Sequence, residues 1–186
     1  MLTINFHPFK NLETERLLLR RVSESDAPEI MELRGNPETM RFVPRPLVTT
    51  IEQAREHFKM IDDKIVENVG INWAITVKGN PKLIGIIGHY RIQPENYRSE
   101  VGYMILPEYN GKGITPEALK AVLEYGFEDM QLHSVEAILD ANNNGSERVL
   151  QKCGFVKEAH FIENEFYNGA FCDNMIYSLL KRNFRK

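Results

Sequence analysis

The clearest hydrophobic pattern in the chain lies in residues 51–65, where apolar side chains recur at steps of three and four residues. These positions are Ile51, Ala54, Phe58, Ile61 and Ile65. Because this spacing places side chains on one face of a helix, the segment is predicted to form an amphipathic helix. Thr50-x-x-Gln53 has the spacing of a capping box, so the helix is expected to begin immediately after Thr50.

The hydrophobic period changes to two in residues 71–77, where Asn72, Ala74 and Thr76 alternate with larger apolar residues. This alternation is typical of a strand. Further strands are expected over residues 83–92 and 99–106. Because the turn sequence Gly79-Asn80-Pro81 follows the first strand, these three strands are predicted to form an antiparallel meander.

Shorter patterns predict four more strands, which cover residues 15–22, 135–139, 156–166 and 170–180. The last two flank Asn168-Gly169, which is a strong hairpin signal. The other predicted helices follow the capping segment 23–26, cover residues 115–130 with Thr115 as N-cap, and run from Ser146 to Gly154. The order β α α β β β α β α β β gives seven strands and four helices, an α/β fold of the α+β kind. Residues 42–49 are expected to be a surface loop.

Composition narrows the class of protein. The chain has 186 residues, 42% of them hydrophobic, and a formal net charge of −3, which is typical of one globular domain over residues 1–186. The near balance of charge argues against a nucleic-acid partner bound by bulk charge. With no apolar run near the ~20 residues of a membrane span and no secretory signal in residues 1–10, the protein is expected to be cytoplasmic, without a membrane partner.

Cysteine and histidine do not indicate a metal site. Cys153 and Cys172 are widely separated and are both interpreted as buried thiols. The five histidines are scattered, and none forms a His-x-x-x-His pair. We therefore expect no metal cofactor.

The strongest chemical signal is the glycine-rich turn Tyr109-Asn110-Gly111-Lys112-Gly113-Ile114-Thr115, between a predicted strand and a predicted helix. Backbone N–H groups and the helix dipole at such a turn can bind an anion, which favours a phosphate ligand. The turn is not a Walker loop, because Gly113 follows Lys112 where Ser or Thr is needed and Leu106 stands at the position of the first glycine. It is not a good dinucleotide fingerprint either, because Pro116 replaces the third glycine. The alternative is a tight connection that binds nothing.

Three motifs resemble a known family. Residues 108–113, Glu-Tyr-Asn-Gly-Lys-Gly, are similar to the Gln/Arg-x-x-Gly-x-Gly/Ala signature of the GNAT superfamily of N-acetyltransferases, with Glu108 as the departure. Asn143-x-x-Ser146, followed by residues 149–155, is similar to a second segment of that family. Residues 14–20, Thr-Glu-Arg-Leu-Leu-Leu-Arg, with Asp26 after them, resemble the opening of its RimJ/RimL-type branch, which includes ribosomal-protein N-terminal acetyltransferases.

The resemblance implies the GNAT fold, a mixed and mostly antiparallel sheet splayed between strands 99–106 and 135–139, with acetyl-CoA in the gap. A main-chain N–H near Ile105 would polarise the thioester, and the edge formed by residues 104–106 would pair with pantetheine. Asn143 would contact the pantetheine arm or the acceptor, whereas Ser146 is expected to cap its helix. The implied cofactor-binding residues are Met104, Ile105, Leu106, Glu108, Asn110, Gly111, Lys112, Gly113, Ile114, Thr115, Asn143 and Ser146.

For the catalytic base the resemblance favours Glu100, acting through water; the alternative is a strand glutamate paired with Arg98 or with another strand. Leu150 stands where the family often has a tyrosine general acid, which leaves Tyr103 and Cys153 as weak candidates for proton return. The expected acceptor-binding residues are Phe42, Trp73 and Tyr90, each with an alternative role in the core, and His89 is a further candidate.

The sequence therefore predicts an enzyme, an acetyl-CoA-dependent N-acetyltransferase that uses direct attack by a primary amine and no covalent enzyme intermediate. The leading acceptor is the N-terminal α-amino group of a ribosomal or other protein. The alternatives are a small-molecule amine (polyamine, amino acid or aminoglycoside), a non-catalytic acyl-CoA-binding sensor, and a nucleotide-binding protein. The chain is expected to be a monomer or a homodimer.

Overall fold

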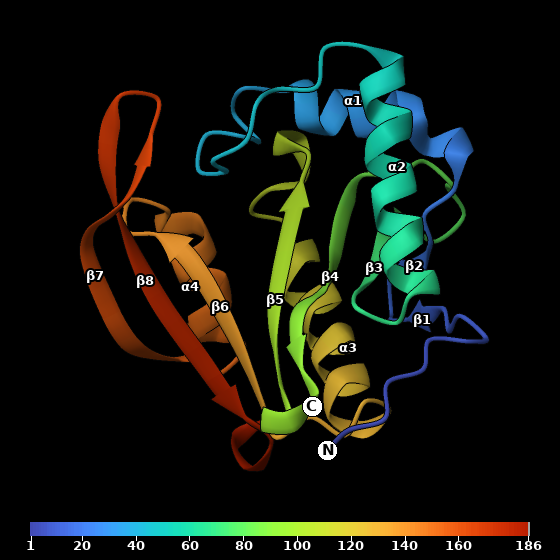
Figure 1. Ribbon diagram of the computed structural model, residues 1–186. Helices are drawn as coiled ribbons and strands as arrows, with labels where there is room; N and C mark the ends of the chain where they lie inside the picture. Colours follow the sequence, from blue (N-terminus) through green and yellow to red (C-terminus); the bar gives the residue numbers. More distant parts are fainter. Residues whose placement is uncertain (186) are drawn as a thin grey trace.

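The computed structural model describes residues 1–185, which form one eight-stranded sheet with four helices (Figure 1). The strand order is β1-β2-β3-β4-β5-β6-β8-β7. The strands are β1 (Leu12–Glu13), β2 (Leu17–Arg21), β3 (Ile71–Val77), β4 (Gly85–Gln93), β5 (Arg98–Ile105), β6 (Ser134–Asp140), β7 (Val156–Tyr167) and β8 (Ala170–Leu180). The helices are α1 (Ala27–Gly35), α2 (Ile51–Val66), α3 (Ile114–Glu128) and α4 (Asn144–Lys152). The fold class and the order of the main elements are confirmed.

The strand beyond the predicted seven is β1, which is only two residues long and pairs antiparallel with β2. A strand of this length is too short to show a period of two, so the hydrophobic pattern does not reveal it. The long hairpin of β7 and β8 has the predicted turn, with left-handed φ angles of 50° at Asn168 and 80° at Gly169. These angles suit a two-residue hairpin loop.

The predicted capping box of α2 is confirmed. The N–H of Gln53 donates to Thr50 Oγ1 at 3.3 Å, and the Thr50 N–H donates back to Gln53 Oε1 at 3.3 Å. Two other predicted caps are wrong. The N-cap of α3 is Gly113, with φ 76°, rather than Thr115. The N-cap of α4 is Asn143, whose Oδ1 accepts the Ser146 N–H at 3.1 Å, so Ser146 is itself inside the helix.

The two faces of the sheet are covered by different helices. On one face, Trp73 of β3 packs edge-on against Tyr125 of α3, with ring centroids 5.0 Å apart. The neighbouring Asn72 points to the other face, because side chains alternate along a strand. There it shares a cavity with His57 and Lys64 of α2. None of the helices in the described part of the chain is long and apolar enough to cross a membrane.

Candidate active site

The sheet separates between β5 and β6, its one parallel pair of neighbours. The two strands pair only at Arg98 with Ser134, Ser99 with Val135 and Glu100 with Glu136. Beyond Glu100, β5 continues to pair with β4, while β6 continues to pair with β8. A wedge-shaped gap therefore opens on one side of β5, and Figure 1 shows the two strands diverging toward the α1 side of the molecule.

The open edge of β5 presents backbone hydrogen-bonding groups to this gap. The N–H of Leu106 donates to the carbonyl of Ile84, on the β4 side, at 2.9 Å. A trans peptide directs its C=O and the following N–H in opposite directions, so the carbonyl of Ile105 faces the gap. In an extended strand the N–H of a residue points to the same side as its C=O, which places the Ile105 N–H there as well.

The glycine-rich turn lies between the end of β5 and the start of α3. Gly111 and Gly113 have φ angles of 73° and 76°, in the left-handed region that favours glycine. A Cβ atom on Gly111 would meet no protein atom within 4 Å. Gly111, Lys112 and Gly113 are exposed, and the first N–H groups of α3, which begins at Ile114, have no acceptor inside the helix. The turn therefore has the donors and the open space that an anionic group requires.

Side chains of the N-terminal segment stabilise the turn through hydrogen bonds and an ion pair. Arg16 Nη1 donates to the carbonyl of Lys112 at 3.0 Å, and Arg16 Nη2 forms an ion pair of 2.6 Å with Glu117 in the first turn of α3. Thr14 Oγ1 donates to the same carboxylate at 2.6 Å. Thr14 and Arg16, which belong to the RimJ/RimL-like opening motif, thus support the anion-binding turn from outside it.

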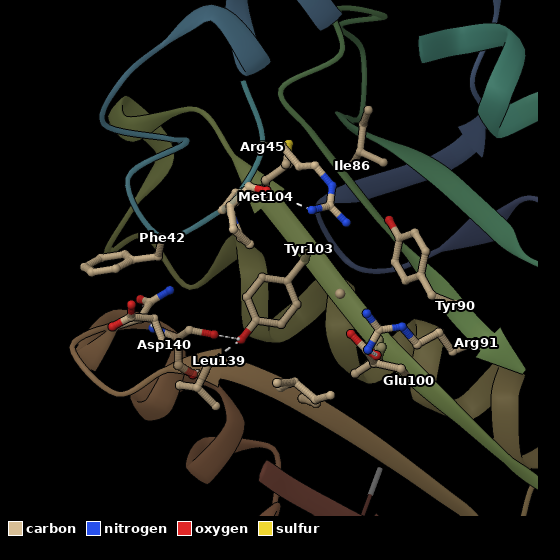
Figure 2. Close-up of a pocket in the computed structure, with 18 of the residues that line it drawn as sticks. Phe42, Arg45, Ile86, Tyr90, Arg91, Glu100, Tyr103, Met104, Leu139 and Asp140 are labelled. Carbon is tan, nitrogen blue, oxygen red and sulfur yellow. Dashed lines mark hydrogen bonds and ion pairs between the residues drawn. The ribbon is translucent and has the colours of Figure 1, made fainter. Parts of the chain in front are cut away.

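A cavity of about 620 Å³ lies on the face of the sheet covered by α2 and by the loop 36–50. Its floor is formed by side chains that alternate along β4 and β5 and therefore share one face, among them Ile86, Tyr90, Glu100 and Met104. Figure 2 shows these side chains around one space, with Arg45 and Phe42 extending over it from the loop. Val101 and Leu139 also line the cavity, so it joins the gap between β5 and β6.

Glu100 lies where the strands begin to separate. Its side chain is 16% exposed, and Oε2 is 2.8 Å from Arg91 Nη1. Burial raises the pKa of Glu100; the charge of Arg91 opposes this rise, and nearby Glu136 adds to it. Of the two expected alternative partners, Arg98 instead pairs with Glu136 at 2.6 Å, whereas a partner on another strand is present, since Arg91 belongs to β4. A partly buried carboxylate with a raised pKa in a cavity has the properties of a general base.

These features coincide with similarity to known proteins. The model of the "Acetyltransferase (GNAT) domain" matches residues 16–156. The chain belongs to the GNAT acetyltransferase family. It is 34% identical over 173 residues to the uncharacterized N-acetyltransferase YoaA of Bacillus subtilis, an alignment that covers 93% of this chain and 98% of that protein. The protein is therefore an N-acetyltransferase.

The names of two other relatives include the acceptor of the acetyl group. The crystal structure of the ribosomal-protein-S5-alanine acetyltransferase from Vibrio fischeri matches with a TM-score of 0.83 and 25% identity, and the match covers 95% of this chain and 100% of that one. The spermidine N(1)-acetyltransferase of Vibrio cholerae is 25% identical over 161 residues, which are 85% of this chain and 89% of that protein. These relatives act on different amines, so similarity alone leaves the acceptor open.

In this GNAT chain a second polar pair spans the gap. The hydroxyl of Tyr103 on β5 lies 2.7 Å from Ser146 Oγ on α4. Burial raises the pKa of Tyr103, so its hydroxyl is protonated at neutral pH. Leu150, which stands at the position of the frequent family tyrosine, is fully buried. Ser146 thus contacts Tyr103 rather than capping α4, and Asn143 both caps the helix and lines the cavity.

Of the residues expected to bind the acceptor, Phe42 and Tyr90 line this cavity, but Trp73 does not. Trp73 is fully buried on the α3 face, where its Nε1 donates to the carbonyl of Lys10 at 2.9 Å. His89 is on that face too, with its ring nitrogens 2.8 Å from Ser99 Oγ and 3.0 Å from the Val122 carbonyl. The prediction for Trp73 is wrong because side chains alternate between the two faces of a sheet. Asn72, the residue before Trp73, is the one on the same face as Tyr90.

The cavity contains residues that the sequence did not single out. Asn72 is 1% exposed, donates from Nδ2 to the hydroxyl of Tyr90, and leaves its Oδ1 without a partner among the described residues. Arg34 and Arg45 enter from α1 and from the loop after it. Cys172 is partly exposed and lines the cavity, so the prediction that both cysteines are buried holds only for Cys153. Strand parity could have indicated Asn72, but no local pattern marks the two arginines.

Proposed function

We propose that this N-acetyltransferase takes its acetyl group from acetyl-CoA bound between β5 and β6. The exposed turn at residues 111–113 and the first N–H groups of α3 suit the pyrophosphate, and the open edge of β5 at Ile105 suits the amide groups of pantetheine. Gly111, Lys112 and Gly113 are exposed and leave room for a ligand. Glu108 is also exposed, so the departure from the family signature leaves this backbone cradle unchanged.

The acceptor is proposed to be a primary amine that enters from the 620 Å³ cavity, with the N-terminal α-amino group of a protein as the first candidate. The similarity to the S5-alanine acetyltransferase of Vibrio fischeri supports a ribosomal protein as its source. A small-molecule amine is the second candidate, because the spermidine N(1)-acetyltransferase of Vibrio cholerae is also similar.

Acetyl-CoA supplies an activated thioester, and the residues of this chain would assist attack on its carbonyl. Glu100 accepts a proton from the acceptor ammonium through water, which leaves a neutral amine. The N–H of Ile105 donates to the carbonyl oxygen as negative charge develops there. The new C–N bond forms as the C–S bond breaks, and the Tyr103–Ser146 pair donates a proton to the departing sulfur. The attacking nitrogen loses its extra proton to water, which returns a proton to Tyr103.

The observation that carries the proposal is that the gap opens at Glu100, so the base and the open strand edge face one space. The test is release of free CoA from acetyl-CoA with amine panels: peptides with Ser, Ala or Met N-termini, polyamines and aminoglycosides. Mass spectrometry of the peptide products then locates the acetyl group. Release with peptides would support the N-terminal assignment, whereas release only with small amines would replace it. A protein that binds acetyl-CoA by calorimetry but releases no CoA with any amine would contradict both.

A further inference from the structure

The acceptor cavity carries an excess of positive charge, although the whole chain has a net charge of −3. Its lining contains the carboxylates of Glu100, Asp140 and Glu165. The guanidinium and ammonium groups are more numerous: Arg34, Arg41, Arg45, Lys64 and Arg91. His57 is neutral at pH 7, because burial and the charges of Arg34 and Lys64 lower its pKa to about 4. The cavity therefore suits a ligand with negative charge.

Arg34, near the C-terminus of α1, is a partly buried basic group with few partners in the protein. Its Nε is buried and has no hydrogen-bond partner among residues 1–185. Its Nη1 reaches only the thioether sulfur of Met104, at 3.9 Å. Burial lowers the pKa of Arg34; the hydroxyl of Tyr90 opposes this effect and the charge of Arg45 adds to it. A partly buried guanidinium without a carboxylate is unfavourable for folding, which points to a ligand as its partner.

In the described structure, none of the three cavity carboxylates pairs with Arg34 or Arg45. Glu100 is paired with Arg91 at 2.8 Å. Asp140 accepts the N–H of Asn142 at 2.7 Å, and Glu165 accepts from Asn174 Nδ2 at 3.1 Å. Arg45 donates only to the carbonyl of Pro44, at 2.8 Å, so its charge is also uncompensated in the described structure. Arg34 and Arg45 thus form a cationic pair on the α1 side of the cavity.

The position of this pair relative to Glu100 limits the ligand. Arg34 contacts Met104, which is four residues beyond Glu100 on the same face of β5. At about 3.3 Å per residue, these positions are about 13 Å apart along the strand. This distance is an upper limit for the acceptor, because a water lies between its amine and Glu100 and the amine must also reach the carbonyl held by the Ile105 N–H. An extended peptide of up to about four residues covers this range.

We propose that Arg34, with Arg45 beside it, binds a carboxylate of the acceptor, and that the preferred acceptor is a peptide N-terminus with Asp or Glu among its first four residues. The proposal rests on the proposed function and specifies its substrate. A guanidinium binds a carboxylate through parallel N–H donors, which an ammonium cannot do. Polyamines, which carry only positive charge, would be repelled by the same pair.

The test uses C-terminally amidated peptides, so that one side chain is the only carboxylate. Asp is placed at position 2, 3 or 4 of an alanine peptide, and each peptide is compared with its Asn counterpart. Free alanine, alaninamide and spermidine complete the panel. We expect kcat/KM to be about ten- to a hundredfold higher for the best Asp peptide than for its Asn counterpart, mainly through KM. A preference of alanine over alaninamide without a preference among peptides would assign the site to an α-carboxylate and overturn the proposal.

Variants test the assignment to Arg34. Arg34→Gln should remove the preference for Asp peptides while leaving the KM for acetyl-CoA and the rate on Asn peptides unchanged. Arg34→Lys, which keeps the charge but loses the planar donors, should retain only part of the preference for Asp peptides. Arg55→Gln is the matched control, because Arg55 is an exposed arginine of α2 that pairs with Glu24 outside the cavity. An equal loss on Asp and Asn peptides in Arg34→Gln would contradict the proposal.

Two further measurements separate the possible failures. Thermal melting should show Arg34→Gln to be as stable as the parent, since Arg34 lacks a partner in the fold. Calorimetric titration of the same peptides into the CoA-saturated protein gives a readout that needs no turnover. Tighter binding of the Asp peptide would support the anion site even if no CoA is released. Equal binding of Asp and Asn peptides would overturn it, and failure to bind acetyl-CoA would contradict the proposed function instead.

Discussion

Arg16 Nε lies 2.7 Å from the Glu117 carboxylate, which joins the N-terminal segment to the first turn of α3 across 101 positions of sequence. The same arginine holds the carbonyl of Lys112, so one guanidinium fixes both ends of the segment that follows Gly111. Burial alone would raise the pKa of Glu117, but its bonds from Thr14 and Arg16 outweigh this and lower it. The carboxylate is therefore ionised at neutral pH and keeps the turn in place.

Glu117→Gln should loosen the glycine-rich turn and raise the KM for acetyl-CoA about three- to tenfold, with a smaller effect on kcat. The physical reason is that a neutral amide cannot accept the same charge-assisted bonds from Arg16. Steady-state kinetics with varied acetyl-CoA measures the change. Glu52→Gln, which removes a first-turn carboxylate from α2, is the control and should leave this KM unaltered.

Gly111→Val should weaken acetyl-CoA binding by at least about tenfold, because valine disfavours a φ of 73° and its side chain would occupy the space above the turn. Calorimetry measures the affinity. Gly79→Val is a matched control, since Gly79 also has a left-handed φ, 84°, and no atom within 4 Å of an added Cβ. Gly79 lies in the β3–β4 turn, so its variant should share the backbone strain but retain the affinity. Equal losses in both variants would remove the turn from the proposed cofactor site.

Glu100→Gln should lower kcat about ten- to a thousandfold with little change in acetyl-CoA affinity, because it removes the proposed base but leaves the strand edge intact. Arg91→Met should raise the pKa of Glu100 further, since it removes the charge that opposes the effect of burial. A base works when deprotonated, so the acidic limb of the pH–kcat profile should move to higher pH. Lys78→Met, which removes an exposed cation paired with Glu13, should leave the profile in place. A parental rate in Glu100→Gln at every pH would exclude Glu100 from the mechanism.

Tyr103→Phe should lower kcat about tenfold or more if the Tyr103 hydroxyl donates a proton toward the departing sulfur. Ser146→Ala removes its hydrogen-bond partner and should have a smaller effect in the same direction. Single-turnover kinetics separates this step from product release. Phe184→Leu is a suitable control because Phe184 packs against Phe127, outside the cavity lining. An unchanged single-turnover rate in Tyr103→Phe would leave water as the proton donor.

Asp26→Asn should destabilise the fold by about 3 kcal/mol at pH 7, because Asp26 is 5% exposed and binds Arg20 at 2.6 and 2.8 Å. Burial alone would raise the pKa of Asp26, but the hydrogen bonds from Arg20 and Ser23 outweigh it and lower the pKa below the unfolded value. The contribution is therefore complete above the unfolded pKa and is lost as pH falls through the folded pKa. Urea denaturation across pH measures it. Asp129→Asn, at an exposed pair with Lys10, should cost less than about 1 kcal/mol.

The sequence alone determined the features that depend on residues close together along the chain. The helix α2 follows from its apolar spacing and capping box, and the β7–β8 hairpin follows from Asn168-Gly169. The glycines of the anion-binding turn are also local, because a left-handed φ is a property of single residues. The motifs in residues 14–20, 108–113 and 143–155, which are also local, indicated the family, and the order of the elements agreed with them.

The tertiary structure decided which residues meet across the cavity. The alternation of residues along a strand does not show which of its two faces packs against which helix. The sequence therefore predicted Trp73 as an acceptor-binding residue, whereas Asn72 is the residue of β3 that lines the cavity. The pairing of Glu100 with Arg91 depends on the register of β4 and β5. The convergence of Arg34 and Arg45 on the space above Met104 depends on how α1 and its loop pack over the sheet. These contacts are set by long-range packing, which no short stretch of sequence encodes, and they determine the charge of the cavity.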